Sequence, residues 1–379
     1  MKQLAPLLLA VALGPACASD SQESSNLLDD HSVIYPNPDW ATAEPAALGF
    51  DSAALDELAK TADGNDSHCL VVTRKGRIVA EWYWDGWTAE SEQVVFSATK
   101  SFTSTLVGIA QDQGRLSIHD PASKYISEWQ GGASAAVTVQ QLLSNSSGRE
   151  WSFLTDYVRM AAGASDKTQF AIDLGQDHDP GSYWEYNNSA IQTLERVLKV
   201  SLGVSDVADY ARTNLLEPIG MKSHMGHDGA GNSVMFADLS ASCRDLARFG
   251  YLFLRKGEWA DGKRIVSEAW VAEATSISTE LNSAYGYLWW LNQPGHYVLP
   301  SSPGRREGDG KQMPALPDTT FAALGLGGQV IGVDPEHEIV FTRIGGSADV
   351  ASTALSGADL TGLDVVTVLS EAVAKAIVK

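Results

Sequence analysis

The stretch Val95-Phe96-Ser97-Ala98-Thr99-Lys100-Ser101-Phe102 decides how this chain is interpreted. Ser97 and Lys100 stand three residues apart, so on a helix their side chains lie on one face, one turn from each other. That spacing places a serine hydroxyl beside an amine that can take its proton, as in a serine nucleophile with a lysine base. The pair alone is a weak signal, because serine and lysine are both common.

Apolar residues flank this stretch at helical spacing and extend to Gly114, which ends the run. We therefore expect a helix that carries Lys100 into the protein core. Bringing the pKa of a lysine from about 10.4 to near neutrality costs roughly 4–5 kcal/mol. Burial and the positive end of the helix dipole both act in that direction, so the segment suits a lysine that is neutral at pH 7.

Length, composition and net charge limit the kinds of protein that this chain can be. The chain has 379 residues, enough for one large domain or two smaller ones, and 44% hydrophobic and 20% charged residues, as in ordinary globular proteins. Its net charge of −20 would repel nucleic acid and anionic membranes. We expect neither as a partner and interpret the acidic balance as a solubilising surface.

The N-terminus has the features of a secretory signal peptide. Lys2 supplies a positive charge, residues 4–13 are mainly apolar, and Ala16-Cys17-Ala18 offers a cleavage site. The apolar run is too short to span a bilayer. We predict that residues 1–18 are a signal peptide and that the protein is exported, to a periplasm or out of the cell. Lipid attachment at Cys17 is the alternative, although Gly14-Pro15 makes a poor lipoprotein signal.

Residues 19–44 begin with a polar, acidic run and are predicted to be a flexible segment before the folded domain. After Cys17 the chain has two cysteines, Cys69 and Cys243. Because they are far apart in the sequence of a large domain, we expect two buried free thiols, with a disulfide between them as the alternative.

Strand patterns occur near both ends of the remaining chain. Residues 69–73 and 77–84 flank the turn Lys75-Gly76, and residues 327–333 and 339–343 flank a second turn. We predict an α+β fold whose antiparallel sheet is built from both chain ends and flanked by helices.

The predicted domain covers residues 45–379. Its α/β part comprises about 45–110 and 320–379, and a mainly helical part, about 111–300, is inserted between them. Residues 296–318, rich in glycine, proline and charge, are expected to be a long irregular loop.

A third group must pass the proton to the leaving atom, and Tyr186-Asn187-Asn188 supplies a candidate just before a predicted helix at 190–202. Tyr186 would be the relay, and the amide of Asn188 would orient Lys100 or the substrate carbonyl. The competing interpretation is structural: Asn188 or Ser189 caps the helix, and Tyr186 packs beside it, half-buried.

The run Ala323-Leu324-Gly325-Leu326-Gly327-Gly328-Gln329 leads into a late strand. Glycine here lets a substrate lie against a strand edge, and the backbone N–H of Leu326 could pair with that of Ser97 as an oxyanion hole. The run has no Walker lysine, so we expect no phosphate binding. The alternative is a bulged, glycine-rich strand start.

Ser-x-x-Lys, Tyr-x-Asn and a glycine-rich strand, in this order, resemble the serine β-lactamase and penicillin-binding superfamily. The resemblance is to its class C-like branch of esterases, D-aminopeptidases and 6-aminohexanoate-dimer hydrolases, and it covers residues 45–379. Further stretches look like landmarks of that branch: residues 114–116, 142–148, 244–250 and 285–290.

The resemblance implies a β-lactamase-like fold, an active site between the sheet and the helical part, and no cofactor or metal. The site residues that it implies are the nucleophile Ser97, the base Lys100, the proton relay Tyr186, the positioning amide Asn188 and, around the oxyanion and the substrate, Leu326, Gly325 and Tyr157.

One departure bears on the substrate. β-Lactamases of this branch carry Lys-Thr-Gly where this chain has Ala323-Leu324-Gly325, so the cation that holds a β-lactam carboxylate is missing. We therefore predict a serine hydrolase that cleaves a small-molecule ester or amide through an acyl-enzyme. The alternatives are a D-aminopeptidase or weak β-lactamase of the same fold, and a non-catalytic homologue that binds peptidoglycan or a peptide.

Three tryptophans, Trp151, Trp289 and Trp290, are either walls of the substrate pocket or core residues. His224 and His227 form a His-x-x-His without the pattern of a zinc-binding helix, and we expect no metal there.

Overall fold

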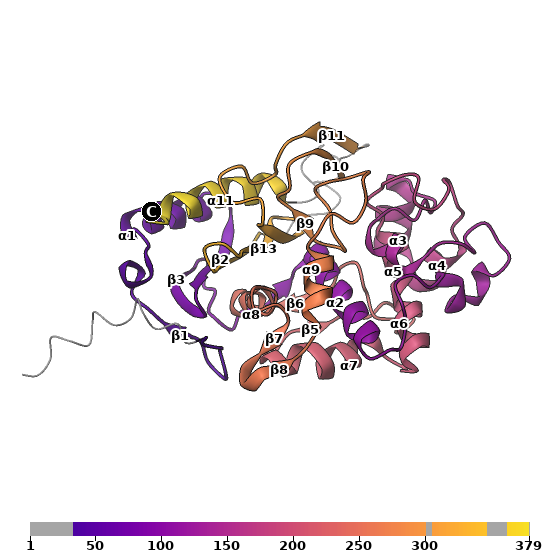
Figure 1. Cartoon of the computed structure of the whole chain (residues 1–379), viewed down its shortest axis with the longest axis horizontal. Coiled ribbons are helices and arrows are strands. Elements are labelled where there is room, and N and C mark those ends of the chain that lie inside the picture. Colours follow the sequence, from indigo (N-terminus) through magenta and orange to yellow (C-terminus); the bar gives the residue numbers. More distant parts are fainter. Residues whose placement is uncertain (1–32, 301–304, 347–361, 379) are drawn as a thin grey trace, which may run out of the picture. The chain divides into compact units, whose positions relative to one another are not determined.

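The computed structural model describes residues 33–300, 305–346 and 362–378, and Figure 1 shows its elements along the chain. The predicted signal peptide, Cys17 and residues 19–32 lie outside the described residues, so cleavage and lipidation stay predictions. Within the described ranges, no helix is long and apolar enough to cross a membrane.

A seven-stranded sheet joins the two ends of the domain. Its strand order is β1-β3-β2-β14-β13-β12-β9, and neighbouring strands are antiparallel except β1 and β3, which run parallel. The strands are Ala41–Thr42 (β1), Ser67–Arg74 (β2), Arg77–Tyr83 (β3), Trp290–Leu291 (β9), Phe321–Gly325 (β12), Gln329–Asp334 (β13) and Ile339–Gly345 (β14). Because β2 pairs with β14, the prediction of an α+β fold with a sheet from both chain ends is confirmed.

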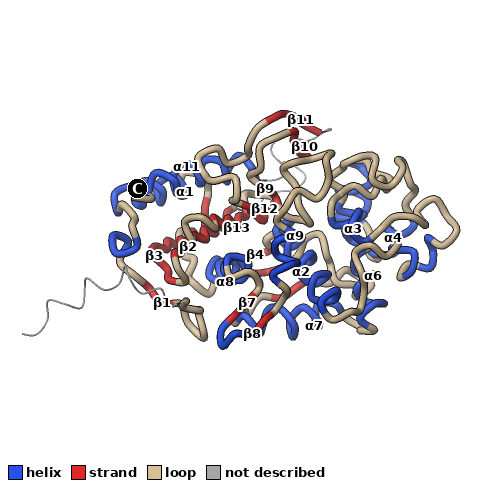
Figure 2. Tube along the Cα trace, viewed as in Figure 1, coloured by secondary structure: helices blue, strands red, loops and turns tan. Residues whose placement is uncertain are grey.

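The local sequence explains the central strands. Lys75 and Gly76 both have positive φ, 52° and 77°, which suits the tight turn between β2 and β3. The strand β2 is buried over most of its length, because helices cover both faces of the sheet. Figure 2 shows α1 (Ser52–Asp63) and α11 (Leu363–Ala376) on one side of the strands and α8 (Cys243–Leu254) on the other.

Most elements between β3 and β12 are helices, and the predicted division of the domain at about residues 111–300 stays a prediction. The helix α2 (Thr99–Asp112), which follows Ser97, is buried through most of its length and packs between the sheet and the inserted helices. Further elements of this part include the α-helices Val139–Leu143 (α3), Lys167–Asp173 (α4), Asn188–Gln192 (α5), Leu194–Leu202 (α6), Val207–Ala211 (α7) and Glu268–Ala274 (α9), and the π-helices Leu154–Gly163 and Arg212–Leu216. Its short strands include Gln93–Val94 (β4), His224–Met225 (β5), Leu239–Ala241 (β6), Glu258–Trp259 (β7) and Lys263–Arg264 (β8).

Residues 33–44 differ from the flexible segment that we expected. Trp40 is buried, and its Nε1 donates to the Arg244 carbonyl oxygen at 3.3 Å. The Arg248 guanidinium donates to the carbonyl oxygens of Pro36 and Pro38. The polar composition that predicts flexibility is confined to the earlier residues, whereas this part carries the aromatic side chains that pack on α8.

The expectation of an irregular loop at residues 296–318 is wrong for its first half. His296–Pro300 (β10) and Arg305–Asp309 (β11) form an antiparallel pair. Further along, Asn292 Nδ2 donates to the Met313 carbonyl oxygen at 2.8 Å, and Asn292 Oδ1 accepts from the Met313 backbone N–H at 2.7 Å. Strand pairing and buried polar contacts therefore order a segment whose glycine and proline content suggested a loop.

The expectation of two free thiols is also wrong. Cys69 and Cys243 form a disulfide, with their Cα atoms 6.3 Å apart across 174 residues of sequence. Cys69 lies on β2 and Cys243 begins α8, so the bond ties the sheet to the helix that covers it. Their separation in sequence hid this proximity, which arises only when α8 packs on the sheet.

We predict that loss of this disulfide lowers the free energy of unfolding by about 2–4 kcal/mol, because the bond restricts a long loop in the unfolded chain. The measurement is urea unfolding of the wild-type protein and of the Cys69→Ser/Cys243→Ser variant. A non-reducing digest should contain one peptide pair linked through Cys69 and Cys243. Free thiols at both positions, or equal stability of the two proteins, would contradict the prediction.

Candidate active site

Ser97 lies in a tight turn that is fixed from two sides. Phe96 before it has a φ of 47°, a left-handed conformation that costs energy for a residue with a side chain. The Val95 amide donates to the Leu239 carbonyl oxygen at 2.8 Å. At the other side, a Cβ on Gly325 would lie 2.2 Å from the Val95 carbonyl oxygen, so only glycine lets the end of β12 approach this turn. The surrounding backbone therefore holds Ser97 at the start of α2.

Lys100 is buried and contacts Ser97 directly. Its Nζ donates to Ser97 Oγ at 2.7 Å and to the Phe236 carbonyl oxygen at 2.8 Å, and only 1% of the residue is exposed. Burial lowers the pKa of Lys100 to about 7, although the carboxylate of Asp156 acts in the opposite direction. A lysine with this pKa is partly neutral at pH 7 and can accept a proton from the serine hydroxyl.

Tyr186 completes a contact triangle with these two residues. Its side chain shares a hydrogen bond with Ser97, and Lys100 Nζ lies 4.8 Å from the centre of its ring. Trp290 stacks on the ring with centroids 5.8 Å apart, and Tyr285 meets it edge-on at 6.2 Å. Burial raises the pKa of Tyr186, so its hydroxyl stays protonated at neutral pH and can donate.

Asp156 is a site residue that the sequence analysis missed. Its buried carboxylate accepts from the backbone amides of Asn188 and Ser189 at 3.1 and 2.7 Å, and from Asn188 Nδ2 and Ser189 Oγ at 2.8 and 2.6 Å. It therefore orients Asn188 at the start of α5. The available signal was an acidic residue directly before the candidate Tyr157, but nothing in the sequence places it beside Asn188.

The alternative role of Asn188 as the helix cap is wrong. Asn187, its neighbour, caps α5 by accepting from the Ala190 amide at 2.8 Å, so the cap lies one residue earlier than the sequence suggested. The Oδ1 atom of Asn188 is buried without a hydrogen-bond partner among the described residues.

A cavity of about 280 Å³ opens at Ser97 and brings most of the predicted site residues together. Asn188, Tyr157 and Leu326 line it with Ser97, while Lys100 and Tyr186 lie behind Ser97. The remaining wall is largely apolar and consists of Val94, Phe96, Ala161, Ala162, Lys167, His227, Val234, Phe236, Ala237 and Asp238.

The oxyanion arrangement stays a prediction. Leu326 packs with Phe96, Phe153 and Tyr157 on the same cavity, directly after Gly325 at the end of β12. This placement is compatible with the amides of Ser97 and Leu326 facing one substrate oxygen.

The tryptophans do not form the wall of this cavity. Trp289 and Trp290 are buried in the core, and Trp151 lines a separate polar cavity of about 220 Å³. The large apolar side chain of a tryptophan indicates burial, but it does not indicate whether the residue lies in the core or in the wall of a cavity. His227 lies at the Ser97 cavity, but within the described part of the chain no group of three or more His, Cys, Asp or Glu could hold a metal ion.

The sheet, the buried α2 and the serine–lysine contact define a β-lactamase-like serine hydrolase. The sequence pattern of the family described as Beta-lactamase matches residues 56–345, so the chain belongs to the β-lactamase family.

Individual relatives are distant. The chain is 22% identical to the 6-aminohexanoate-dimer hydrolase of Paenarthrobacter ureafaciens over 342 residues, which cover 81% of this chain and 80% of that protein. Among solved structures, a putative β-lactamase from Bacteroides dorei has a TM-score of 0.69 at 19% identity, covering 87% of this chain and 100% of its own. A family VIII carboxylesterase has a TM-score of 0.61 at 16% identity, covering 88% and 97%.

We predict that the Lys100 ammonium titrates near pH 7 and that Asp156→Asn lowers this pKa further. The sign follows from charge: the Asp156 carboxylate favours the ammonium, and the variant removes that stabilisation. NMR of ¹³Cε-labelled lysine measures the pKa, and Lys100→Met identifies the resonance. A Lys100 pKa above 9, or an increase in the Asp156→Asn variant, would contradict the prediction.

Proposed function

We propose that this protein is an exported serine hydrolase that cleaves an ester or amide through an acyl-enzyme on Ser97. The single observation that carries the proposal is the 2.7 Å contact between Ser97 Oγ and the buried Lys100 Nζ, whose pKa is about 7. Serine attacks a carbonyl only when a neighbouring group accepts its proton, and a neutral lysine in contact with it can do so.

In the proposed acylation, neutral Lys100 takes the proton of Ser97 while Oγ forms a bond to the substrate carbonyl carbon. The second hydrogen bond of Lys100, to the Phe236 carbonyl oxygen, fixes its amine during this transfer. The carbonyl electron pair moves to the oxygen, which the amides of Ser97 and Leu326 would stabilise.

The intermediate then expels the leaving group. Tyr186 gives its hydroxyl proton to the departing oxygen or nitrogen and takes one from the Lys100 ammonium, so the charges balance and Lys100 is neutral again. Water attacks the acyl-enzyme by the reverse set of proton transfers. The side-chain amide of Asn188, which Asp156 holds at the cavity, would orient the substrate carbonyl. Tyr157 would contact the acyl group.

Ester or amide substrates are favoured over β-lactams by the cavity. Ala323-Leu324-Gly325 on β12 supplies no cation where a β-lactam carboxylate would lie, and most of the wall is apolar. The likeness to a 6-aminohexanoate-dimer hydrolase and a family VIII carboxylesterase supports this class of reaction.

Export is supported by two independent features. Residues 1–18 carry the signal pattern, and the Cys69–Cys243 disulfide suits an oxidising compartment outside the cytoplasm.

We expect a fluorophosphonate to label Ser97 and Ser97→Ala to reduce kcat/KM for short p-nitrophenyl esters at least about 10³-fold. The matched control is Ser104→Ala, which removes a buried hydroxyl on the same helix that has no partner among the described residues. This control should retain activity within a few-fold. Labelling at another residue, or turnover by Ser97→Ala near the wild-type rate, would refute the proposal.

A further inference from the structure

The turn that follows β12 carries Leu326, whose backbone N–H is the second proposed donor to the substrate oxygen. Leu326 lines the Ser97 cavity, and Gly325 before it ends β12. The Gly328 amide donates to the Gly325 carbonyl oxygen at 3.0 Å and closes the turn. In a trans peptide the C=O and the N–H point in opposite directions. Because the Gly325 carbonyl points into the turn, the Leu326 N–H points out of it.

The turn needs help to keep this geometry. Gly327 and Gly328 have φ values of 80° and 76°, a conformation that glycine adopts readily but that also costs it more conformational entropy than any other residue. A donor in an oxyanion hole is effective only when it is held in place before the reaction begins. A turn with two glycines therefore requires contacts from the rest of the protein.

Buried side chains supply these contacts at the three carbonyl oxygens of residues 326–328. Gln329 Nε2 donates to the Leu326 carbonyl oxygen at 3.1 Å. The Arg343 guanidinium donates to the carbonyl oxygens of Gly327 and Gly328. Gln329 is fully buried, and only 1% of Arg343 is exposed. The peptide groups of the turn are thus held from inside the protein.

The side chain of Gln329 is fixed at its other end by β14. Its Oε1 accepts from the Gly345 backbone N–H at 3.1 Å, and its Nε2 lies 3.4 Å from the Gly345 carbonyl oxygen. Gln93 on β4 donates to that same carbonyl oxygen at 2.8 Å. Gln329 therefore connects the backbone of Leu326 to the end of a central strand of the sheet.

Gly325 contacts both Gln329 and the turn before Ser97. A Cβ on Gly325 would lie 3.1 Å from Gln329 Cβ and 2.2 Å from the Val95 carbonyl oxygen. The side chain that holds Leu326 thus packs against the residue that lets β12 approach the nucleophile. Loss of the Gln329 contacts would move Leu326 relative to Ser97.

We propose that Gln329 is a positioning residue for the acyl transfer. Its side-chain amide fixes the carbonyl oxygen of Leu326 and so keeps the N–H of Leu326 directed at the substrate oxygen, which becomes negative as Ser97 attacks. Gln329 acts through the turn and not on the substrate itself. This inference rests on the proposed function and identifies what holds its second oxyanion donor in place.

The test compares p-nitrophenyl butyrate with its thiono analogue, in which sulfur replaces the carbonyl oxygen. Sulfur is larger and accepts hydrogen bonds more weakly, so the thionoester gains less from an oxyanion hole. Both substrates release p-nitrophenol. The readout is the ratio of kcat/KM for the ester to that for the thionoester. A smaller fraction of folded protein lowers both values equally and leaves this ratio unchanged.

We expect Gln329→Met to lower the ratio by about tenfold or more, mainly by slowing ester cleavage, since loss of one oxyanion donor costs about 10²–10³ in kcat. Gln329→Asn keeps a polar amide in the core but is one methylene shorter, so it cannot span from Leu326 to Gly345. It should lower the ratio in the same direction, and it serves as the test if Gln329→Met does not fold.

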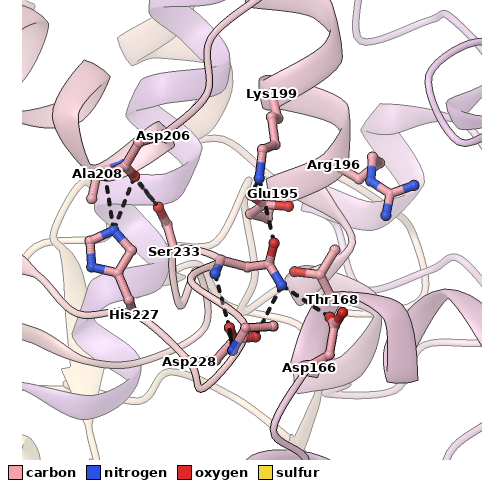
Figure 3. A network of polar contacts seen from close by, with 12 residues as sticks. Asp166, Thr168, Glu195, Arg196, Lys199, Asp206, Ala208, His227, Asp228 and Ser233 are labelled. Atoms are coloured by element: carbon pink, nitrogen blue, oxygen red, sulfur yellow. Dashed lines mark hydrogen bonds and ion pairs between the residues drawn. The ribbon is translucent and has the colours of Figure 1, made fainter.

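Gln192→Met is the matched control. Gln192 is also fully buried; its Nε2 donates to Thr168 Oγ1 and to the Ser233 carbonyl oxygen, both at 2.9 Å, and its Oε1 accepts from the Met235 amide at 2.9 Å. Thr168 and Ser233 belong to the polar network drawn in Figure 3. This control loses the same kind of hydrogen bonds as Gln329→Met, so it should also have a lower Tm but keep the wild-type ratio.

A wild-type ratio in a folded Gln329 variant, or an equal decrease in Gln192→Met, overturns the role of Gln329. Failure of the proposed function is separate: in that case short p-nitrophenyl esters are not cleaved and Ser97 is not labelled, and this inference falls with it.

Discussion

The burial of Lys100 against Ser97 is the constraint on which the rest of the structure depends. An ammonium in the core is unfavourable, so burial pushes this lysine toward its neutral form, in which it can accept the serine proton. Hydrogen bonds from Nζ to Ser97 Oγ and to the Phe236 carbonyl oxygen hold the amine beside the serine. Because α2 lies between the sheet and the inserted helices, the Lys100 amine is shielded from water.

The same contact organises the segments around it. The turn before Ser97 needs Gly325 on one side and Leu239 on the other, and Lys100 donates to the Phe236 carbonyl oxygen three residues before Leu239. Asp156 accepts from Asn188 Nδ2, and its carboxylate also acts to raise the pKa of Lys100. The Cys69–Cys243 disulfide ties the start of α8, four residues after Leu239, to the sheet.

Local patterns made much of this predictable from the sequence. The three-residue spacing of Ser97 and Lys100 is a property of one helix, and the turn at Lys75-Gly76 is a property of one hairpin. The disulfide and the contacts of Asp156 were not predictable in this way, because each joins segments that are distant in the sequence. Trp290 shows the same limit: its size indicated burial, but only the fold reveals that it stacks on Tyr186.

The most direct test of the central claim is the rate at which a fluorophosphonate modifies Ser97, measured from pH 5 to pH 10. If buried Lys100 is the base, the rate rises about tenfold per pH unit below its pKa of about 7 and is level above it. In Lys100→Met this rise of the rate with pH should be absent, and Ser97 should be modified only slowly. A rate independent of pH between 5 and 8, or the same rise in Lys100→Met, would contradict the account.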